Sequence, residues 1–413
     1  MTVPVSTAHR PAVAWLYLLS ALSSGLGNAV SNIVWPWLVL QRTGDPAAAG
    51  LVATCIFVPS IGFAIAGGSF IDRFGRKPMS IISDTISALS VVGLIAVDVY
   101  LGLNLTWFII IGIIGAVGDI PGMAARTALA GDVSAASGKE LDWLAGANQA
   151  ILGISLFVGP AVAGVLLTAI PISSILWITA GCSAFAALLT VFIRLHPGAS
   201  DVQTETQENV FCGWKSWFRI VADARVRLLA ICGWIFNILA MPFLMVLLPG
   251  HFERVNEPIP MGLALSSYAV GMVIGGGIVA KVGTDNRRRL WTISMLLTTV
   301  GFCLLGWLSN SYAVIAGMAI AGVGSGLQGP LVTVIVTENI SEALRGRAFS
   351  LFNAINLVAA PLGLSITTIV LRFTDIYPTA IGFAGIWAVS VVWFIAEGLR
   401  VMGTKQQQEE ATV

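Results

Sequence analysis

Long apolar segments alternate with short polar turns along most of the chain. A membrane-spanning helix needs about 20 mostly apolar residues to cross about 30 Å of hydrocarbon. Twelve segments meet this requirement, and they lie within residues 13–40, 47–70, 79–101, 105–129, 143–169, 172–193, 228–249, 262–282, 290–308, 312–336, 349–371 and 377–398. None shows the alternation over about 10 residues that marks the strands of a membrane barrel. The pattern predicts an all-α polytopic membrane protein with 12 transmembrane helices.

The composition agrees with this pattern. Only 10% of the 413 residues are charged, whereas soluble domains average about 25%, and the mean hydropathy is +0.88. The five cysteines show neither metal-ligand spacing nor a secreted disulfide pattern. We therefore expect the lipid bilayer as the surroundings, with no metal, no cofactor and no nucleic-acid partner.

The basic residues indicate how the chain is oriented, because lysine and arginine concentrate on the cytoplasmic side of membrane proteins. With a cytoplasmic N-terminus and twelve crossings, only Arg42, Arg254 and Arg372 fall outside, and the other 19 of the 22 basic residues are cytoplasmic. A wrong number of spans would exchange the sides of every later loop and remove this bias. We expect both termini to lie in the cytoplasm, and the protein to lie in the cytoplasmic (inner) membrane.

A polar stretch divides the chain near its middle. Residues 196–210 read "HPGASDVQTETQENV" and have the composition of a disordered linker. In residues 211–221, Phe211, Trp214 and Phe218 recur at helical spacing, which favours a short helix in the membrane interface. The predicted organisation is a six-helix bundle in 1–195, a cytoplasmic linker in 196–224, a second six-helix bundle in 225–400 and a disordered tail in 401–413.

The two halves repeat one another. Gly67–Gly68 have counterparts 209 residues later in Gly276–Gly277, and Pro121 pairs with Pro330 at the same offset. Pro160 corresponds to Pro361 at an offset of 201. A repeat of six helices is typical of a secondary transporter with a substrate site between two similar bundles.

The turn between the second and third segments carries a motif. Residues 67–79 read "GGSFIDRFGRKPM" and closely resemble the signature G-x-x-x-D-R-x-G-R-K/R of the major facilitator superfamily, with a degenerate second copy at 276–289. The resemblance implies two bundles related by a pseudo-twofold axis. We expect a cytoplasmic gate from this turn and the start of the eleventh helix, comprising Gly68, Asp72, Arg73, Gly75, Arg76, Lys77, Arg345 and Arg347.

Asp72 distinguishes a gate from a simple topology anchor. An anchor needs only the positive charges of the turn, since the positive-inside rule ignores acids. Asp72 is expected to pair with Arg345 or Arg347, or to lie at the positive N-terminal end of their helix, which stabilises an exposed acid by about 0.3–1 kcal/mol. Such contacts would hold the cytoplasmic mouth shut in one state and break in the other.

A second motif lies in the fifth segment. Its small residues and proline resemble G-x-x-x-G-P-x-x-G-G of the drug:proton antiporter branch, and they are Ser155, Gly159, Pro160, Ala163 and Gly164. Ser155 and Ala163 replace two glycines of that pattern. The stretches 34–44, 141–151 and 345–348 are similar to actinobacterial multidrug efflux pumps of the tetracycline/aminoglycoside type. We interpret the motif as a close helix contact that seals the outer part of the cavity, the alternative being ordinary small-residue packing.

Proton coupling needs an acid whose protonation alternates with access, and intramembrane acids are expensive enough to suggest function. The candidates are Asp119, Arg126 and Asp84. Asp119 and Arg126 lie seven residues apart on one helical face, about 10.5 Å along the axis, and we expect a water-linked pair. Asp119 satisfied by a neighbouring helix is the alternative, and Asp84 is expected mainly to support the 72–77 turn. The first segment carries Asn28 and Asn32 where many proton-coupled exporters have an acid, and amides carry no proton.

Neutral polar groups among aromatic and methionine side chains suit a cavity for amphipathic molecules. The cavity candidates are Asn28, Asn32, Trp35, Asn148, Gln149, Trp234, Asn237, Met241, Gln328, Asn353 and Asn356. We find no catalytic constellation and expect no enzyme. The chain is predicted to export drug-like molecules as a monomer, with a small-molecule substrate and protons as partners. Export of a native metabolite, siderophore or lipid, or a sensor that does not transport, are the alternatives.

Overall fold

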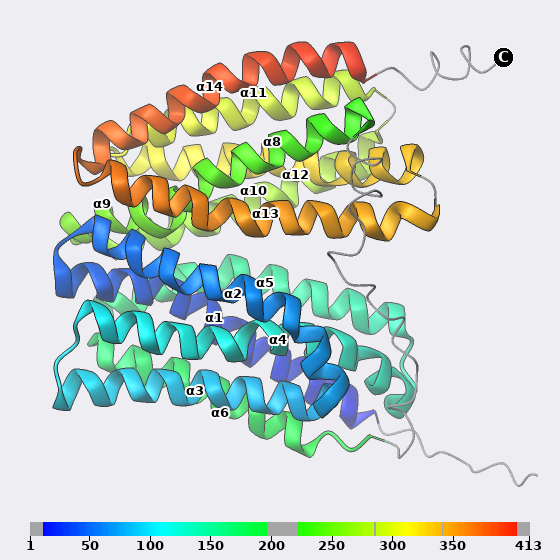
Figure 1. Ribbon diagram of the computed structural model, residues 1–413. Helices are drawn as coiled ribbons and strands as arrows, with labels where there is room; N and C mark the ends of the chain where they lie inside the picture. Colours follow the sequence, from blue (N-terminus) through cyan, green and yellow to red (C-terminus); the bar gives the residue numbers. More distant parts are fainter. Residues whose placement is uncertain (1–10, 196–221, 285, 341, 403–413) are drawn as a thin grey trace, which may run out of the picture. The chain divides into compact units, whose positions relative to one another are not determined.

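The structure is a computed structural model that describes residues 11–195, 222–284, 286–340 and 342–402 (Figure 1). No strand occurs among these residues. The helices are α1 (Ala12–Thr43), α2 (Pro46–Phe74), α3 (Arg76–Tyr100), α4 (Leu105–Ser137), α5 (Leu141–Ala169), α6 (Ile172–Phe192), α8 (Ala224–Pro242), α9 (Leu248–Arg254), α10 (Pro258–Val282), α11 (Arg287–Gly306), α12 (Ser311–Asn339), α13 (Glu342–Val370) and α14 (Ile376–Val401). A π-helical turn, Phe243–Leu247, joins α8 to α9. The predicted linker 196–210, the interfacial helix 211–221 and most of the tail lie outside the described residues.

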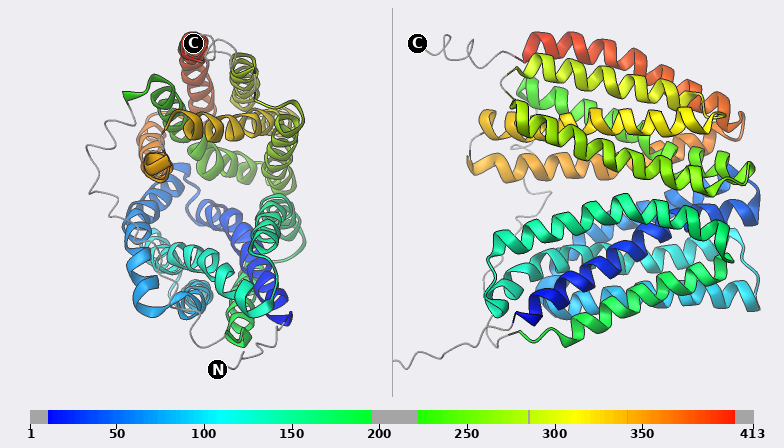
Figure 2. Two further views of the ribbon diagram at one scale, coloured as in Figure 1. Left: turned by 90° about the vertical axis from the view of Figure 1, so that its right-hand side faces the viewer. Right: turned by 180° about the vertical axis from the view of Figure 1, so that it is seen from behind.

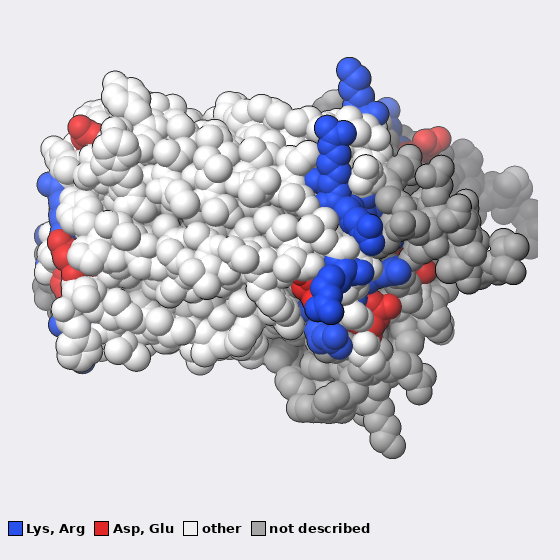
Figure 3. All heavy atoms as spheres, turned by 90° about the horizontal axis from the view of Figure 1, so that it is seen from above, with Lys and Arg blue, Asp and Glu red and all other residues white. Residues whose placement is uncertain are grey.

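All twelve predicted segments are helical. Within the described residues, 11 helices are long and apolar enough to cross a membrane, with α8, the π-helical turn and α9 forming the single span Ala224–Arg254. The remaining predicted segment, 349–371, corresponds to α13, whose apolar part is the shorter stretch Ala354–Val370. On the face shown in Figure 3, charged side chains lie toward the two ends of the helices and the wide zone between them is uncharged. The prediction of an all-α polytopic membrane protein is confirmed.

Short polar side chains start several of these helices. The side-chain oxygens of Asn104, Asp223, Asn286, Asn310 and Asp375 each accept a hydrogen bond from a backbone N–H in the first turn. The first N–H groups of a helix have no partner within it, and such caps stabilise a helix by about 1 kcal/mol. Single Asn and Asp residues therefore mark the starts of these five helices in the sequence.

The helices pack into two compact units. Unit 1 contains α1 up to Val34, Val58–Gly159 and the segment from Ile170 through α6, while unit 2 contains Trp35–Phe57, Pro160–Ala169 and helices α8 to α14. The units follow helix packing, and the domain boundaries expected from the sequence stay a prediction. Helices α1, α2 and α5 each continue from one unit into the other, and each contains a proline within two residues of that point: Pro36, Pro59 and Pro160.

The same helix pairing recurs in the two units. In unit 1, α3 packs against α4 and α6, and in unit 2, α11 packs against α12 and α14 (Figures 1 and 2). The cores differ in composition. An aromatic cluster fills unit 2, where Phe302 stacks on Trp387 with ring centroids 5.2 Å apart and meets Phe243 edge to face. Phe243 is 1% exposed and therefore belongs to the core.

Glycines bring α10 and α12 into backbone contact. A Cβ added to Gly326 would lie 2.2 Å from the carbonyl oxygen of Met272, and one added to Gly275 would lie 2.3 Å from that of Val323. Because lipid tails are as apolar as the side chains, membrane helices associate through such close van der Waals packing. Gly326 and Gly275 are therefore required by the packing.

We predict that Gly326→Ala destabilises the protein by about 1–3 kcal/mol, the usual effect of overpacking. The matched control is Gly277→Ala on α10, where an added Cβ meets nothing within 4 Å. Thermal unfolding of the two purified variants in detergent measures the difference. Equal melting temperatures for both variants would show that α10 and α12 do not approach this closely.

Candidate functional site

A charged cluster is buried in unit 1 where α1, α3 and α4 meet. Asp84 of α3 is 3% exposed, and its Oδ2 accepts a short hydrogen bond from Nη2 of Arg126 on α4. Its other oxygen, Oδ1, accepts a hydrogen bond from Ser24 Oγ of α1 at 3.0 Å. Both carboxylate oxygens of Asp84 are thus occupied by donors from different helices.

Asp119 completes this cluster. Its carboxylate accepts a hydrogen bond from the side chain of Ser87 on α3 and interacts electrostatically with both Asp84 and Arg126. The buried cluster therefore contains two carboxylates and one guanidinium. When all three are ionised its net charge is −1, which is expensive to hold in a low-dielectric interior.

The direct partner of Arg126 corrects the sequence-based expectation. We predicted a pair between Arg126 and Asp119, with Asp84 mainly supporting the 72–77 turn. In the structure Arg126 binds Asp84 directly. Asp119 lies two turns away along the same helix, whereas Asp84 is presented by the neighbouring α3, which packs against α4. All three predicted proton-coupling candidates are nevertheless brought together.

The turn between α2 and α3 is held by its own charges. Gly75 has φ +85°, a left-handed conformation that favours glycine and confirms the predicted tight reversal. Arg76 Nη1 donates to Asp132 Oδ1 on α4 at 3.0 Å, and Lys77 Nζ donates to the carbonyl oxygen of Val191 at 3.0 Å. The Arg73 guanidinium lies 5.7 Å from the centroid of its neighbour Phe74.

Other members of the predicted gate lie outside the described side chains. These are Gly68, Asp72, Arg345 and Arg347. The gate role of the motif therefore stays a prediction.

Sequence reasoning missed the acid that receives Arg76. The first residue of α3, Arg76, pairs with Asp132 near the end of α4, and the first residue of α11, Arg287, pairs with Glu338 near the end of α12. Each unit thus ties the start of its third helix to its fourth helix. The signal was available in the internal repeat, because basic and acidic residues recur at similar spacing in both halves.

The antiporter-like motif of α5 packs closely in both units. In unit 1, a Cβ added to Gly159 would lie 2.3 Å from Ala29 Cβ of α1. In unit 2, a Cβ added to Gly164 would lie 2.6 Å from the carbonyl oxygen of Pro258, and Ala163 is fully buried. A Cβ added to Gly262 of α10 would lie 2.3 Å from the carbonyl oxygen of Pro160. The small residues therefore permit two close helix contacts, while their sealing role stays a prediction.

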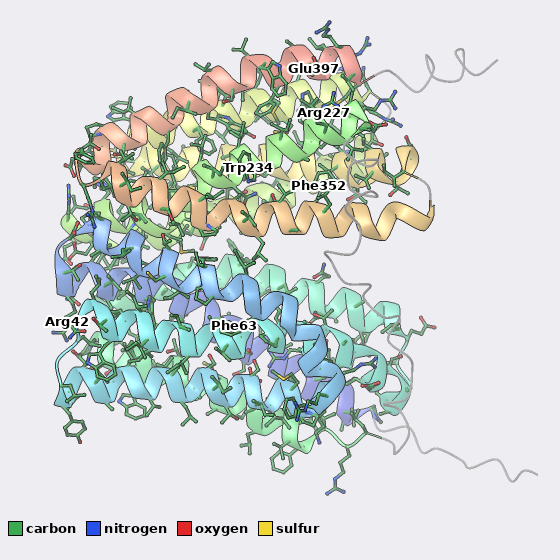
Figure 4. The ribbon with its side chains drawn as sticks, viewed as in Figure 1. Arg42, Phe63, Arg227, Trp234, Phe352 and Glu397 are labelled. Carbon is green, nitrogen blue, oxygen red and sulfur yellow. The ribbon has the colours of Figure 1, made fainter. Side chains whose placement is uncertain are left out.

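The predicted cavity residues fall into separate groups. Asn237 Nδ2 of α8 donates to Asn356 Oδ1 of α13 at 3.1 Å. Trp234 on α8 is 38% exposed, and Figure 4 labels it together with Phe352 on the adjacent α13. Half-buried positions are occupied by Asn28, Trp35, Asn148, Met241 and Gln328, and exposed ones by Asn32 and Gln149. The side chain of Asn353 lies outside the described set. Their lining of one cavity stays a prediction.

Unit 2 contains a neutral group on the helices that correspond to those of the charged cluster. Gln328 Nε2 of α12 donates to Cys232 Sγ of α8 at 3.5 Å, and this sulfur lies 3.9 Å from Met295 Sδ of α11. Gln328 follows Asp119 by 209 residues, the offset that also relates Pro330 to Pro121. The repeat therefore has an acid in one half and an amide in the other.

An exposed ion pair at a helix end of unit 2 contrasts with the buried cluster. Arg254 Nη1 donates to both carboxylate oxygens of Asp375, at 2.7 and 3.0 Å. Partial burial alone would raise the pKa of Asp375, but hydrogen bonds from the Ile376 N–H and from Arg254 outweigh it and lower the pKa. Exposed pairs of this kind contribute about 0–1 kcal/mol.

No cluster of His, Cys, Asp and Glu suited to a metal occurs in the described part of the chain.

The repeated apolar helices define a polytopic helical membrane protein. Residues 17–283 and 255–412 match the model of the Major Facilitator Superfamily, and the chain belongs to this family. It is therefore a multi-pass membrane transporter of small molecules and not an enzyme.

Named relatives match most of the chain. It is 28% identical over 357 residues to the multidrug efflux pump Tap of Mycobacterium tuberculosis, covering 85% of each protein. It is 24% identical over 350 residues to macrolide efflux protein A of Streptococcus pyogenes, covering 83% of this chain and 85% of that protein.

Solved structures show the same fold. The nucleoside transporter NupG superposes with a TM-score of 0.75 at 16% identity, covering 93% of this chain and 98% of that one. A bacterial homologue of the human lysosomal transporter Spinster gives a TM-score of 0.72 at 13% identity, covering 97% and 100%. These likenesses confirm the major facilitator fold expected from the 67–79 motif.

We predict that Asp84→Asn destabilises the protein far more than Asp375→Asn. The first change leaves the buried Arg126 without its direct carboxylate, and breaking such a pair costs about 3–5 kcal/mol. The second breaks an exposed pair and leaves an asparagine, which still caps α14. Adding Arg126→Gln to Asp84→Asn is expected to recover part of the loss. Unfolding in detergent measures these three variants and Arg126→Gln alone, and strictly additive effects of the two buried substitutions would contradict the pairing.

Proposed function

We propose that this chain is a secondary active transporter that exports amphipathic, drug-like molecules across the cytoplasmic membrane by alternating access, in exchange for protons. Its similarity to Tap and to macrolide efflux protein A over more than four-fifths of the chain supports drug export. The exposed Trp234 and the amide pair Asn237–Asn356 lie on the adjacent helices α8 and α13. Aromatic surface beside neutral hydrogen-bonding groups suits amphipathic substrates.

The buried cluster is the observation that carries proton coupling. Arg126 neutralises one of the two carboxylates, and the direct hydrogen bond joins it to Asp84. The remaining carboxylate, Asp119, has the hydroxyl of Ser87 as its hydrogen-bond donor. A proton on Asp119 makes the cluster neutral, and its release leaves a net charge of −1. Because a buried net charge is costly, loss of the proton favours a state in which water reaches Asp119.

Among the described residues, the repeat supports one proton-binding cluster, that of unit 1. The corresponding group in unit 2, Cys232, Met295 and Gln328, contains no acid. A proton that moves down a potential of 100 mV supplies about 2.3 kcal/mol. Exchange of one proton per substrate is therefore expected to concentrate a neutral substrate up to about 40–50-fold on the opposite side even without a pH gradient.

The cytoplasmic turn is proposed to act as the gate. Arg76 and Lys77 fix the start of α3 to α4 and to the Val191 carbonyl. Asp72 is the acid proposed for the gate on the basis of the sequence motif, and its side chain lies outside the described set. The turn lies in the cytoplasm in the orientation that the basic residues favour. The chain is proposed to work as a monomer, since both gate and cluster are supplied by one copy.

We predict that Asp119→Asn abolishes drug-driven proton movement while the protein still folds and inserts. The amide keeps the shape of the side chain but takes up no proton. Proteoliposomes with an internal pH dye, supplied with a macrolide or a tetracycline, measure the movement. Asp98→Asn, which removes an acid near the end of α3 outside the cluster, is the matched control. Normal proton movement in Asp119→Asn would refute the coupling role, and failure of the unaltered protein to move either drug would refute drug export.

We predict that Asp72→Asn strongly reduces transport without changing membrane insertion. The substitution removes the acid of the gate and leaves Arg73, Arg76 and Lys77, which carry the topology signal. Uptake of the same drugs into inverted membrane vesicles measures transport, and immunoblotting of the membranes measures insertion. Unchanged transport would leave the turn with the role of a topology anchor only.

A further inference from the structure

Helix α1 lies between the buried cluster and the antiporter-like motif of α5. Ser24 is 4% exposed and donates from Oγ to Asp84 Oδ1 at 3.0 Å. The next residue, Gly25, faces α5, because a Cβ added there would lie 2.7 Å from Ser155 Oγ. One turn later Ala29 meets Gly159 of the same motif. Two adjacent residues of one helix thus contact the cluster on one side and the motif on the other.

The other contacts of α1 in unit 1 restrict how it can move. Tyr17 lies seven residues before Ser24 and therefore on the same face, and its hydroxyl donates to the carbonyl oxygen of Arg126 at 3.2 Å. A third face contacts α6, where Ser23 Oγ donates to the carbonyl oxygen of Cys182 at 2.8 Å. Close-packed contacts transmit small shifts rather than absorbing them. A shift of α1 at Ser24 therefore changes its fit against Ser155.

The hydrogen bond from Ser24 depends on the charge of the cluster. A hydroxyl binds an ionised carboxylate more strongly than a neutral one. The charged groups that face Asp84 are Arg126 and Asp119, both from α4. The titratable group contributed by α6, Cys182, contacts Ser23 rather than Ser24. Asp84 stays paired with Arg126, and Asp119 interacts electrostatically with both groups. A proton gained or lost by Asp119 therefore changes the negative charge beside Asp84 and, through the shared Arg126, the strength of the Ser24 hydrogen bond.

We propose that Ser24 and Gly25 form a positioning link, through which the protonation state of the Asp84–Arg126–Asp119 cluster sets the position of α1 against the motif of α5. This inference rests on the proposed proton exchange and adds a route by which it reaches the motif. Ser24 is a positioning residue, since its hydroxyl does not titrate in the range in which the cluster exchanges protons. Gly25 is the point of contact, because any side chain there meets Ser155.

The first test compares two adjacent serines. Ser24→Ala removes a donor that stabilises ionised Asp84, so the cluster takes up its proton more readily. The pH midpoint of drug–proton exchange in proteoliposomes is expected to rise by about one unit, the size of a typical hydrogen bond to a charged group. Ser24→Thr keeps the hydroxyl and restores the original midpoint. Ser23→Ala, which loses its hydrogen bonds to Cys182 of α6 and none to the cluster, is the matched control and leaves the midpoint unchanged.

The second test enlarges one side chain at the contact between α1 and α5 and makes its partner smaller. Gly25→Ala places a methyl group against Ser155 Oγ and is expected to reduce the exchange rate. Ser155→Ala removes that oxygen and leaves Ser155's Cβ position at the ordinary contact distance of 3.4 Å. The double variant Gly25→Ala/Ser155→Ala is therefore expected to recover most of the rate. The Gly25 and Ser155 variants test the positioning link even if Ser24→Ala fails to fold.

The outcomes separate this link from the proposed function. An unchanged pH midpoint in Ser24→Ala, or no recovery in the Gly25/Ser155 double variant, overturns the link. If the link is overturned in this way but Asp119→Asn still abolishes proton movement in the same assay, the proposed proton exchange stands without the link. Normal proton movement in Asp119→Asn instead refutes the proton exchange on which the link depends.

Discussion

One guanidinium, that of Arg126, faces the carboxylates of Asp84 and Asp119, and donors from three helices of unit 1 meet at this imbalance of charge. Insertion scales put the cost of one charged residue at the centre of a spanning helix at about 2.5–3.5 kcal/mol. The structure offsets this cost with donors from three helices, because Ser24 comes from α1, Ser87 from α3 and Arg126 itself from α4. No one of these helices supplies all the hydrogen-bond donors that the carboxylates need. The charge balance of the cluster therefore depends on the packing of the three helices against one another.

The two units use different means to hold similar helix arrangements. Unit 2 packs aromatic rings between α8, α11 and α14 and brings glycines of α10 against the α12 backbone. Unit 1 places charged groups where its first, third and fourth helices meet, and the corresponding helices of unit 2 carry the neutral group Cys232, Met295 and Gln328. An apolar core tolerates movement without any change of charge, whereas a core with an unmatched carboxylate changes its stability whenever a proton arrives or leaves. The difference in composition therefore implies that protonation affects the stability of unit 1 more than that of unit 2.

The sequence predicted the helices well because the bilayer itself sets their length and apolar character. It also predicted the reversal at Gly75, since a positive φ demands glycine there. It did not predict that Arg126 binds Asp84 rather than Asp119. Spacing along one helix shows which residues share a face, but the rotation of a neighbouring helix is set by packing. Asp132 and Glu338 were missed for the same reason, although their recurrence in both halves offered a clue.

The position of α1 explains why a first helix without an acid is compatible with proton exchange. Asn28 and Asn32 carry no proton, yet they follow Ser24 at intervals of four residues and so continue the face that touches Asp84. A helix of this kind has no need to carry the proton, because a hydroxyl bonded to the carboxylate already reports its charge. In the proposed exchange the proton site belongs to α3 and α4, and Asn28 and Asn32 of α1 stay candidates for contact with the substrate. In this proposal the proton and the substrate bind to different residues of unit 1. Helix α1 contacts both sites, and this contact is what makes the two ligands bind alternately in an exchanger.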